Sequence, residues 1–133
     1  MTSIASSVPS NALPAAGWPP PGVLDDEALM QLAALDPGGT RGLLARVLDT
    51  YRVSLGSLLD QLRVARTGSD LQTQRHVAHT LKSSSASVGA LALSTLCAEA
   101  ERRLRDGAAH DMDSLLEALA SEGRRLQLAL GAP

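Results

Sequence analysis

The sequence of 133 residues contains no phenylalanine, and aromatic residues make up only 2% of it. β-Strands are usually enriched in aromatic and β-branched side chains, so this scarcity argues against a sheet. The hydrophobic residues, 44% of the chain, are mostly leucine, alanine and valine, and the first two are strong helix formers. The composition therefore predicts an all-α protein.

Cysteine and long apolar runs are also scarce. The chain has one cysteine, Cys97, which excludes an intramolecular disulfide and indicates a reducing compartment. No apolar run approaches the roughly 18 residues that cross a bilayer, and residues 1–9 have neither the basic segment nor the apolar core of a secretory signal. We therefore expect a cytoplasmic protein without direct membrane contact.

The chain also lacks a strong charge of either sign. Its formal net charge is −2 and its pI is about 5.8. Without a basic field, nucleic acid is not an expected partner. Of the 12 basic residues only Lys82 is a lysine. It lies three residues after His79, so on a helix the two side chains share one face.

Residues 1–23 differ in composition from the rest of the chain. They are rich in proline and serine and cannot form a helix, so we expect a tail or linker. Trp18 lies within this segment, and the sequence leaves two alternatives open for it: docking onto the domain, or exposure to solvent. Residues 24–133 are the expected helical domain.

From Leu24 onward, apolar residues recur at the three- and four-residue spacing of helices. A first short helix is expected after Asp25 or Asp26, and Asp36-Pro37 ends it. Thr40 is the expected cap of a long second helix, which closes at residues 67–69. The third helix is expected at about 70–88, with a C-cap at Gly89, and the fourth at about 91–106.

The fifth helix is expected to open at Asp111 or Asp113, with Gly123 at a close helix contact. Short connections between the last four helices predict antiparallel neighbours. The expected fold is an up-down antiparallel four-helix bundle with an additional short N-terminal helix. His110 and Cys97 are expected to be an ordinary loop residue and a core residue, respectively.

The third helix carries the most informative side chains. With Val77 at the centre of its buried stripe, Leu81, Ser84 and Val88 also face inward, and His79 lies about 200° away, toward water. The side chains within about 60° of His79 include two cations and two small residues: Arg75, Lys82, Ser83 and Ala86.

The run from His79 to Ala90, HTLKSSSASVGA, is followed at Leu96 to Glu101 by LCAEAE. These segments resemble the histidine-containing phosphotransfer (HPt) domain of multistep phosphorelays. The family pattern is His-x-x-Lys-Gly-Ser-[Ser/Ala]-Ala-x-[Leu/Val]-Gly-Ala, and the likeness extends over about residues 24–130. Ser83 departs from the pattern, which has glycine there. Both residues are small enough to let a partner approach.

The resemblance implies that His79 accepts a phosphoryl group, that Lys82 stabilises charge beside it, and that Glu101 orients the imidazole. A carboxylate that accepts from Nδ1–H leaves Nε2 as the nucleophile. The resemblance also implies a docking surface for a partner, made of Arg75, His76, Ser83, Ala86 and Ala90.

In this interpretation the chain takes a phosphoryl group from the phospho-aspartate of a receiver domain and passes it to another receiver aspartate. The partners are response-regulator receiver domains or a hybrid histidine kinase. The sequence has no ATP-binding motif, so autonomous kinase activity is not expected. We expect a monomer without a cofactor or metal of its own, and Mg²⁺ on the receiver.

Two other functions remain open at this point. His76, His79 and Glu101 could hold a metal ion, although Lys82 beside a divalent cation is unfavourable. Alternatively, the chain is a helical adaptor that binds a partner through the His79 face without chemistry. Arg102, Arg103 and Arg105 form a basic run that is either solvated or used to dock an acidic partner.

Overall fold

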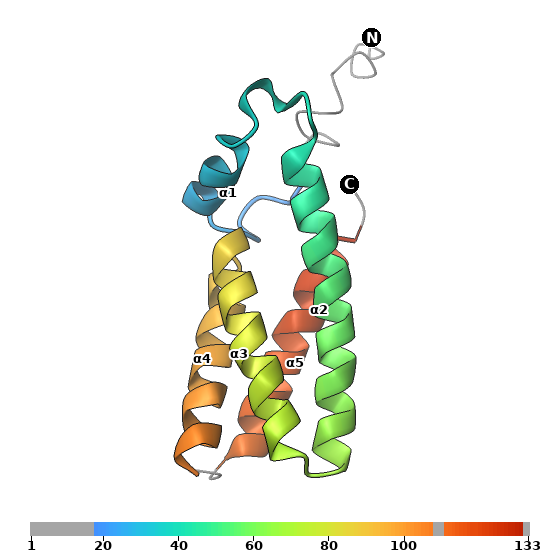
Figure 1. The fold of residues 1–133 in the computed structure, drawn as a ribbon, viewed down its shortest axis with the longest axis vertical. Helices are drawn as coiled ribbons and strands as arrows, with labels where there is room; N and C mark the ends of the chain where they lie inside the picture. Colours follow the sequence, from blue (N-terminus) through green and yellow to red (C-terminus); the bar gives the residue numbers. More distant parts are fainter. Residues whose placement is uncertain (1–17, 108–110, 132–133) are drawn as a thin grey trace.

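The computed structural model describes residues 18–107 and 111–131, and all the regular elements in these ranges are helical. Four long helices run alternately up and down side by side, and a short helix covers one end of the bundle (Figure 1). The all-α, up-down prediction is confirmed. His110 lies outside the described residues. The helices are α1 (Asp26–Ala33), the 3₁₀ turn η2 (Pro37–Gly39), α2 (Leu43–Thr67), α3 (Leu71–Val88), α4 (Leu91–Asp106) and α5 (Met112–Ala129).

Capping residues set the ends of α1, α3 and α4. The Asp25 carboxylate accepts from the first turn of α1, and the Asp70 carboxylate does the same for α3, which satisfies backbone N–H groups that lack helical partners. Gly89 and Gly107 end α3 and α4 in the left-handed conformation, which glycine adopts without steric cost. These ends agree with the sequence prediction.

The start of α2 differs from the prediction. Thr40 does not cap the helix, because α2 begins at Leu43 with Gly42 as its N-cap. The buried carboxylate of Asp36 acts instead, accepting from the N–H groups of Arg41 and Leu43 at 3.1 Å each. The hydrogen bond from the Leu43 N–H is the main reason why the pKa of Asp36 lies below its usual value. A residue seven positions upstream therefore caps this helix.

The core is built from leucines of all four long helices, together with Cys97, whose thiol pKa is raised to about 12 by burial. At Gly123 a Cβ atom would approach Leu59 to 2.9 Å, which confirms the predicted close helix contact and identifies α2 as the neighbour. No helix among the described residues is long and apolar enough to cross a membrane.

The buried stripe of α3 lies slightly to one side of its expected position. Ser85, not Ser84, is the fully buried serine, and its hydroxyl is 2.7 Å from the Tyr51 hydroxyl of α2. The buried positions of α3 are centred about 50° from Val77 at 100° per residue. This rotation moves Ser84 to the edge and leaves His79 almost opposite the core.

Trp18 belongs to the core. Its side chain is 6% exposed and packs in the same cluster as Leu24 and Leu44. Of the two alternatives for Trp18, the structure therefore shows docking onto the domain. Among the described residues, the indole Nε1 is the one buried side-chain nitrogen or oxygen without a hydrogen-bond partner. The division of the chain at residue 24 stays a prediction.

We predict that Trp18→Ala lowers the free energy of unfolding by about 3 kcal/mol, because it leaves a large cavity in the core. Urea denaturation followed by circular dichroism measures the change. Met30→Ala is the matched control: Met30 is 70% exposed, so we expect a change below about 0.5 kcal/mol. Equal stabilities for Trp18→Ala and the wild type would contradict the core assignment.

Candidate functional site

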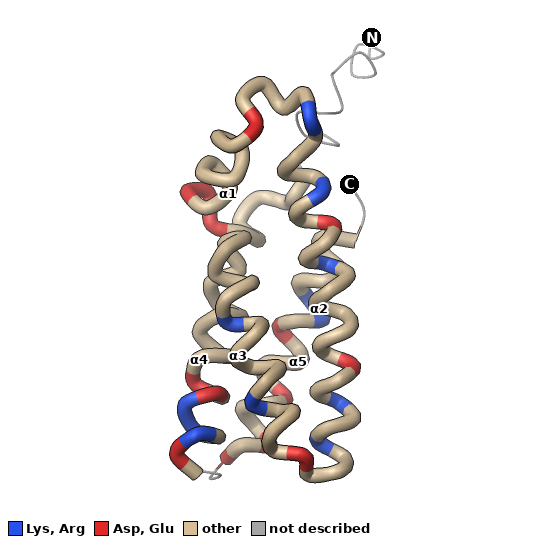
Figure 2. The backbone as a smooth tube through the Cα atoms, in the orientation of Figure 1, with Lys and Arg blue, Asp and Glu red and all other residues tan. Residues whose placement is uncertain are grey.

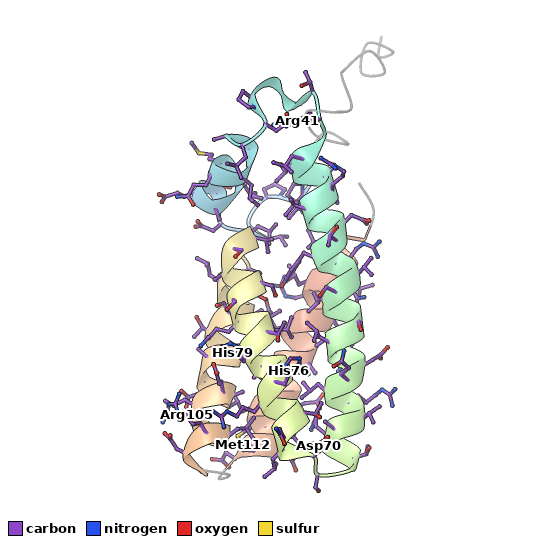
Figure 3. The ribbon with its side chains drawn as sticks, viewed as in Figure 1. Arg41, Asp70, His76, His79, Arg105 and Met112 are labelled. Atoms are coloured by element: carbon purple, nitrogen blue, oxygen red, sulfur yellow. The ribbon has the colours of Figure 1, made fainter. Side chains whose placement is uncertain are left out.

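His79 projects from the outer face of α3. Its side chain is 61% exposed, and Figure 3 shows it together with His76 along the same helix. The neighbouring inward positions Val77, Ala78 and Leu81 are buried, so the backbone beneath the ring is fixed by the core. The imidazole is therefore anchored at its base and accessible at its edge.

The carboxylate of Glu101 on α4 connects two side chains of α3. Its Oε2 lies 2.8 Å from Nδ1 of His79, and its Oε1 accepts from Nζ of Lys82 at 2.7 Å. The Glu101 side chain is 13% exposed, whereas His79 and Lys82 are much more open to solvent. A largely buried carboxylate thus holds two α3 side chains across the seam between the helices.

The charge state of Glu101 determines which imidazole nitrogen is free. The hydrogen bond from Lys82 is the main cause that lowers the pKa of the Glu101 carboxyl, and the contact with His79 lowers it further, while burial opposes both. An ionised carboxylate can only accept hydrogen bonds, so Nδ1 of His79 must be the donor. In the neutral ring, Nε2 then carries the lone pair.

Lys82 has a structural partner that the sequence did not predict. We expected its ammonium group to stabilise charge on a transferred phosphoryl group, but the ammonium group donates to Glu101. Its 38% exposed side chain lies beside His79, as the three-residue spacing predicted. Lys82 therefore contacts the same carboxylate that contacts the imidazole.

An open depression surrounds the exposed edge of the ring. His79, Glu101, Arg75 and His76 line it, together with Gln72, which the sequence did not identify. Gln72 lies seven residues before His79, two helical turns along the same face, so its position was readable from the spacing alone. The depression joins the expected site residues of α3 to the carboxylate of α4.

The expected docking residues separate into two groups. Arg75, His76, Ser83 and Ala86 are exposed on α3, so their docking roles remain compatible with the structure. Ala90 is 4% exposed and belongs to the core. Its assignment to a docking surface is wrong, because α1 covers this end of the bundle. The N–H of Asp25 donates to the carbonyl of the adjoining Gly89 at 2.9 Å.

The arginines of the basic run in α4 form ion pairs with carboxylates of the same helix. Arg102 and Arg103 both donate to Glu99, at 2.6 Å and 2.7 Å, and these contacts lower the pKa of Glu99 to about 2. Arg105 and Arg102 also pair with Asp106. Figure 2 shows these charges together at one end of α4. This neutralisation weakens the case for docking an acidic partner there.

The metal-site alternative has little support from the side chains. Within residues 18–107 and 111–131, no three histidine, cysteine, aspartate or glutamate side chains lie close enough to hold a metal ion. His76 contributes to the depression, but both oxygens of Glu101 already have partners in His79 and Lys82. The trio His76, His79 and Glu101 therefore does not form a ligand set.

Comparison with known proteins agrees with this geometry. The family model described as the Hpt domain matches residues 46–131, and curated protein sequences give no match. The fold is similar to the crystal structure of histidine-containing phosphotransfer protein B (HptB) from Pseudomonas aeruginosa PAO1. The TM-score is 0.72 at 27% identity, over 84% of this chain and 93% of that one. The family match covers most of the bundle and includes His79, Lys82 and Glu101, so this chain belongs to the Hpt domain family.

Proposed function

We propose that this domain is a phosphorelay intermediate that accepts a phosphoryl group on His79 from the phospho-aspartate of one receiver domain and passes it to the aspartate of another. The 2.8 Å contact between His79 Nδ1 and Glu101 carries the proposal. In the neutral imidazole this contact favours the tautomer with the lone pair on Nε2 of the exposed ring, which is the form that attacks phosphorus.

The proposed reaction needs little beyond positioning and charge balance. The Nε2 lone pair attacks the phosphorus of the aspartyl phosphate in line, and the P–O bond breaks with its electron pair going to the aspartate carboxylate. The imidazole, which keeps its Nδ1 proton, becomes positively charged as the N–P bond forms. Glu101 faces that proton and stabilises the positive ring, and the reverse steps deliver the group to the next receiver.

A partner can approach the site over small side chains. Ser83 and Ala86 are exposed one and two turns beyond His79, and helix α3 carries no acidic residue between 71 and 88. Receiver domains hold their reacting aspartate in an acidic pocket, so a partner face without carboxylates avoids like-charge repulsion. The exposed cation of Arg75 on the preceding turn adds a weak attraction for the same pocket.

The proposal assigns the Mg²⁺ of the reaction to the receiver. The carboxylate nearest to His79 is that of Glu101, and both its oxygens are used, whereas Mg²⁺ prefers free carboxylate and phosphate oxygens. We further propose that the domain acts as a monomer in the cytoplasm, with response regulators or a hybrid histidine kinase as partners. We propose no kinase activity of its own, because the sequence contains no recognised ATP-binding motif.

We predict that His79→Gln abolishes phosphoryl acceptance while the fold is retained, because glutamine lacks the nucleophilic nitrogen. The assay incubates the chain with receiver domains from the same organism, phosphorylated with ³²P-labelled acetyl phosphate, and follows the label by electrophoresis. His76→Gln is the control and should still accept label. Labelling of the His79→Gln chain would refute the assignment. If the wild-type chain binds the receiver but accepts no label on His79, the helical adaptor without chemistry would be favoured.

We predict that Glu101→Ala slows phosphoryl acceptance by roughly 10- to 100-fold, as for other residues that orient a reacting imidazole. Glu101→Gln should be affected less, because the amide oxygen still accepts from Nδ1–H although the charge is lost. Initial rates with the same labelled receiver measure both variants. Equal rates for Glu101→Ala and the wild type would show that another group orients the ring.

We predict that Lys82→Ala raises the pKa of Glu101 toward its ordinary value and slows transfer by roughly tenfold. A lowered carboxyl pKa contributes stability above the unfolded value of 4.5, and this contribution is lost as pH falls through the folded value. Carbon-detected NMR titration of the Glu101 carboxyl, in the wild type and in Lys82→Ala, measures the change. An unchanged titration midpoint would contradict the proposed role of Lys82.

A further inference from the structure

Helices α3 and α4 are joined at a second point near the site. The hydroxyl of Ser94, in the first turn of α4, donates to the main-chain carbonyl of Lys82 at 2.9 Å in a partly buried position. Lys82 is therefore held twice by α4: at its carbonyl by Ser94, and at its ammonium group by Glu101. A carbonyl oxygen has two lone pairs, so it can accept from Ser94 in addition to the helical N–H.

This bond differs from those of the serines on α3. The hydroxyls of Ser84 and Ser87 donate one turn back within their own helix, to Thr80 at 3.1 Å and to Ser83 at 3.0 Å. Bonds of that kind hold a side chain but do not relate one helix to another. The bond of Ser94 crosses the seam, so its length depends on how α4 is placed along α3.

The spacing of the two contacts determines what they control. Ser94 and Glu101 are seven residues apart, so they lie two turns apart on the same side of α4, about 10 Å along its axis. On α3 their partners are Lys82 and His79, one turn apart. Two hydrogen bonds at different positions along the contact between α3 and α4 oppose both the sliding of α4 along α3 and its rotation about its own axis.

We infer that Ser94 is a positioning residue for phosphoryl transfer, which holds α4 at the height where Glu101 meets Nδ1 of His79. The inference rests on the proposed function of His79. Hydrogen bonds of this kind span about 2.7 to 3.2 Å, so a displacement of more than about half an ångström takes the 2.8 Å contact out of that range. A free ring exchanges its proton between the two nitrogens, and the nucleophilic form is then less populated.

The test compares Ser94→Ala and Ser94→Thr in the full chain, with Ser84→Ala as the matched control. Ser84 is also partly buried and also donates to a helical carbonyl, but within α3. The first measurement is the ¹⁵N NMR spectrum of the His79 ring without phosphate, which reports the population protonated at Nδ1. The second is the rate of phosphorylation by phosphoramidate, whose P–N bond breaks as Nε2 bonds to phosphorus and ammonia leaves.

For Ser94→Ala we expect a smaller Nδ1–H population and a rate reduced by roughly 3- to 10-fold, as for small misplacements of reacting groups. Ser94→Thr, which retains a hydroxyl, restores both readings, and Ser84→Ala changes neither. The inference would be overturned if Ser94→Ala had the same ring spectrum and the same rate as the wild type. It would also be overturned by a Ser84→Ala chain that is equally impaired, or by a Ser94→Thr chain that is not restored.

The two readings also separate this inference from the function on which it rests. If the wild-type chain accepts no phosphoryl group from phosphoramidate or from a receiver, the proposed function fails. The ring spectrum requires no phosphorylation, so it still decides whether Ser94 sets the contact between His79 and Glu101.

Discussion

The site depends on one carboxylate shared between two helices. Glu101 of α4 accepts from His79 and from Lys82 of α3, and without it the imidazole would be an exposed histidine of no defined tautomer. The hydrogen bond from the ammonium group favours the ionised carboxylate, and the ionised carboxylate accepts from Nδ1 of the ring. The charge of Lys82, the only lysine in the chain, thus favours, through Glu101, the tautomer of His79 whose lone pair is on Nε2.

The shared carboxylate requires α3 and α4 to keep one register. Their connection is two residues long, with Gly89 in the left-handed conformation, so α4 begins directly where α3 ends. Leu81, Leu93 and Cys97 are fully buried on the inner faces of the two helices. Close packing of these side chains resists sliding over larger distances, and within that register the outer-face polar contacts set the height of Glu101 against His79.

The helices and the outward position of His79 could be predicted from the sequence, because both follow from a periodicity along one chain. The caps at Asp25, Asp70 and Gly89 are equally local. The role expected for Glu101 came from the family resemblance, since it lies 22 residues after His79 and no spacing rule connects them. The pairing of Lys82 with Glu101 was missed for the same reason. It depends on the register of two helices.

Other features depended on contacts that the sequence does not contain. Asp36 caps α2 from outside the helix, and its capping needs the turn at residues 37–39 to bring the carboxylate back. Ala90 is buried because α1 covers it, and Trp18 is buried because its side chain packs in the same cluster as Leu24 and Leu44. The composition predicted no helix in residues 1–23, and the described part, residues 18–23, contains none, yet Trp18 of this stretch belongs to the core.

The buried thiol of Cys97 gives this molecule a built-in reporter of its own opening. It is the only cysteine of the chain, it is 0% exposed, and it lies one turn before Glu101 on α4. An alkylating reagent can reach it only when the helices separate, because a buried thiol is unreactive. The rate at which the thiol is modified therefore measures how often the bundle opens locally near the imidazole, in unaltered protein and without an attached probe.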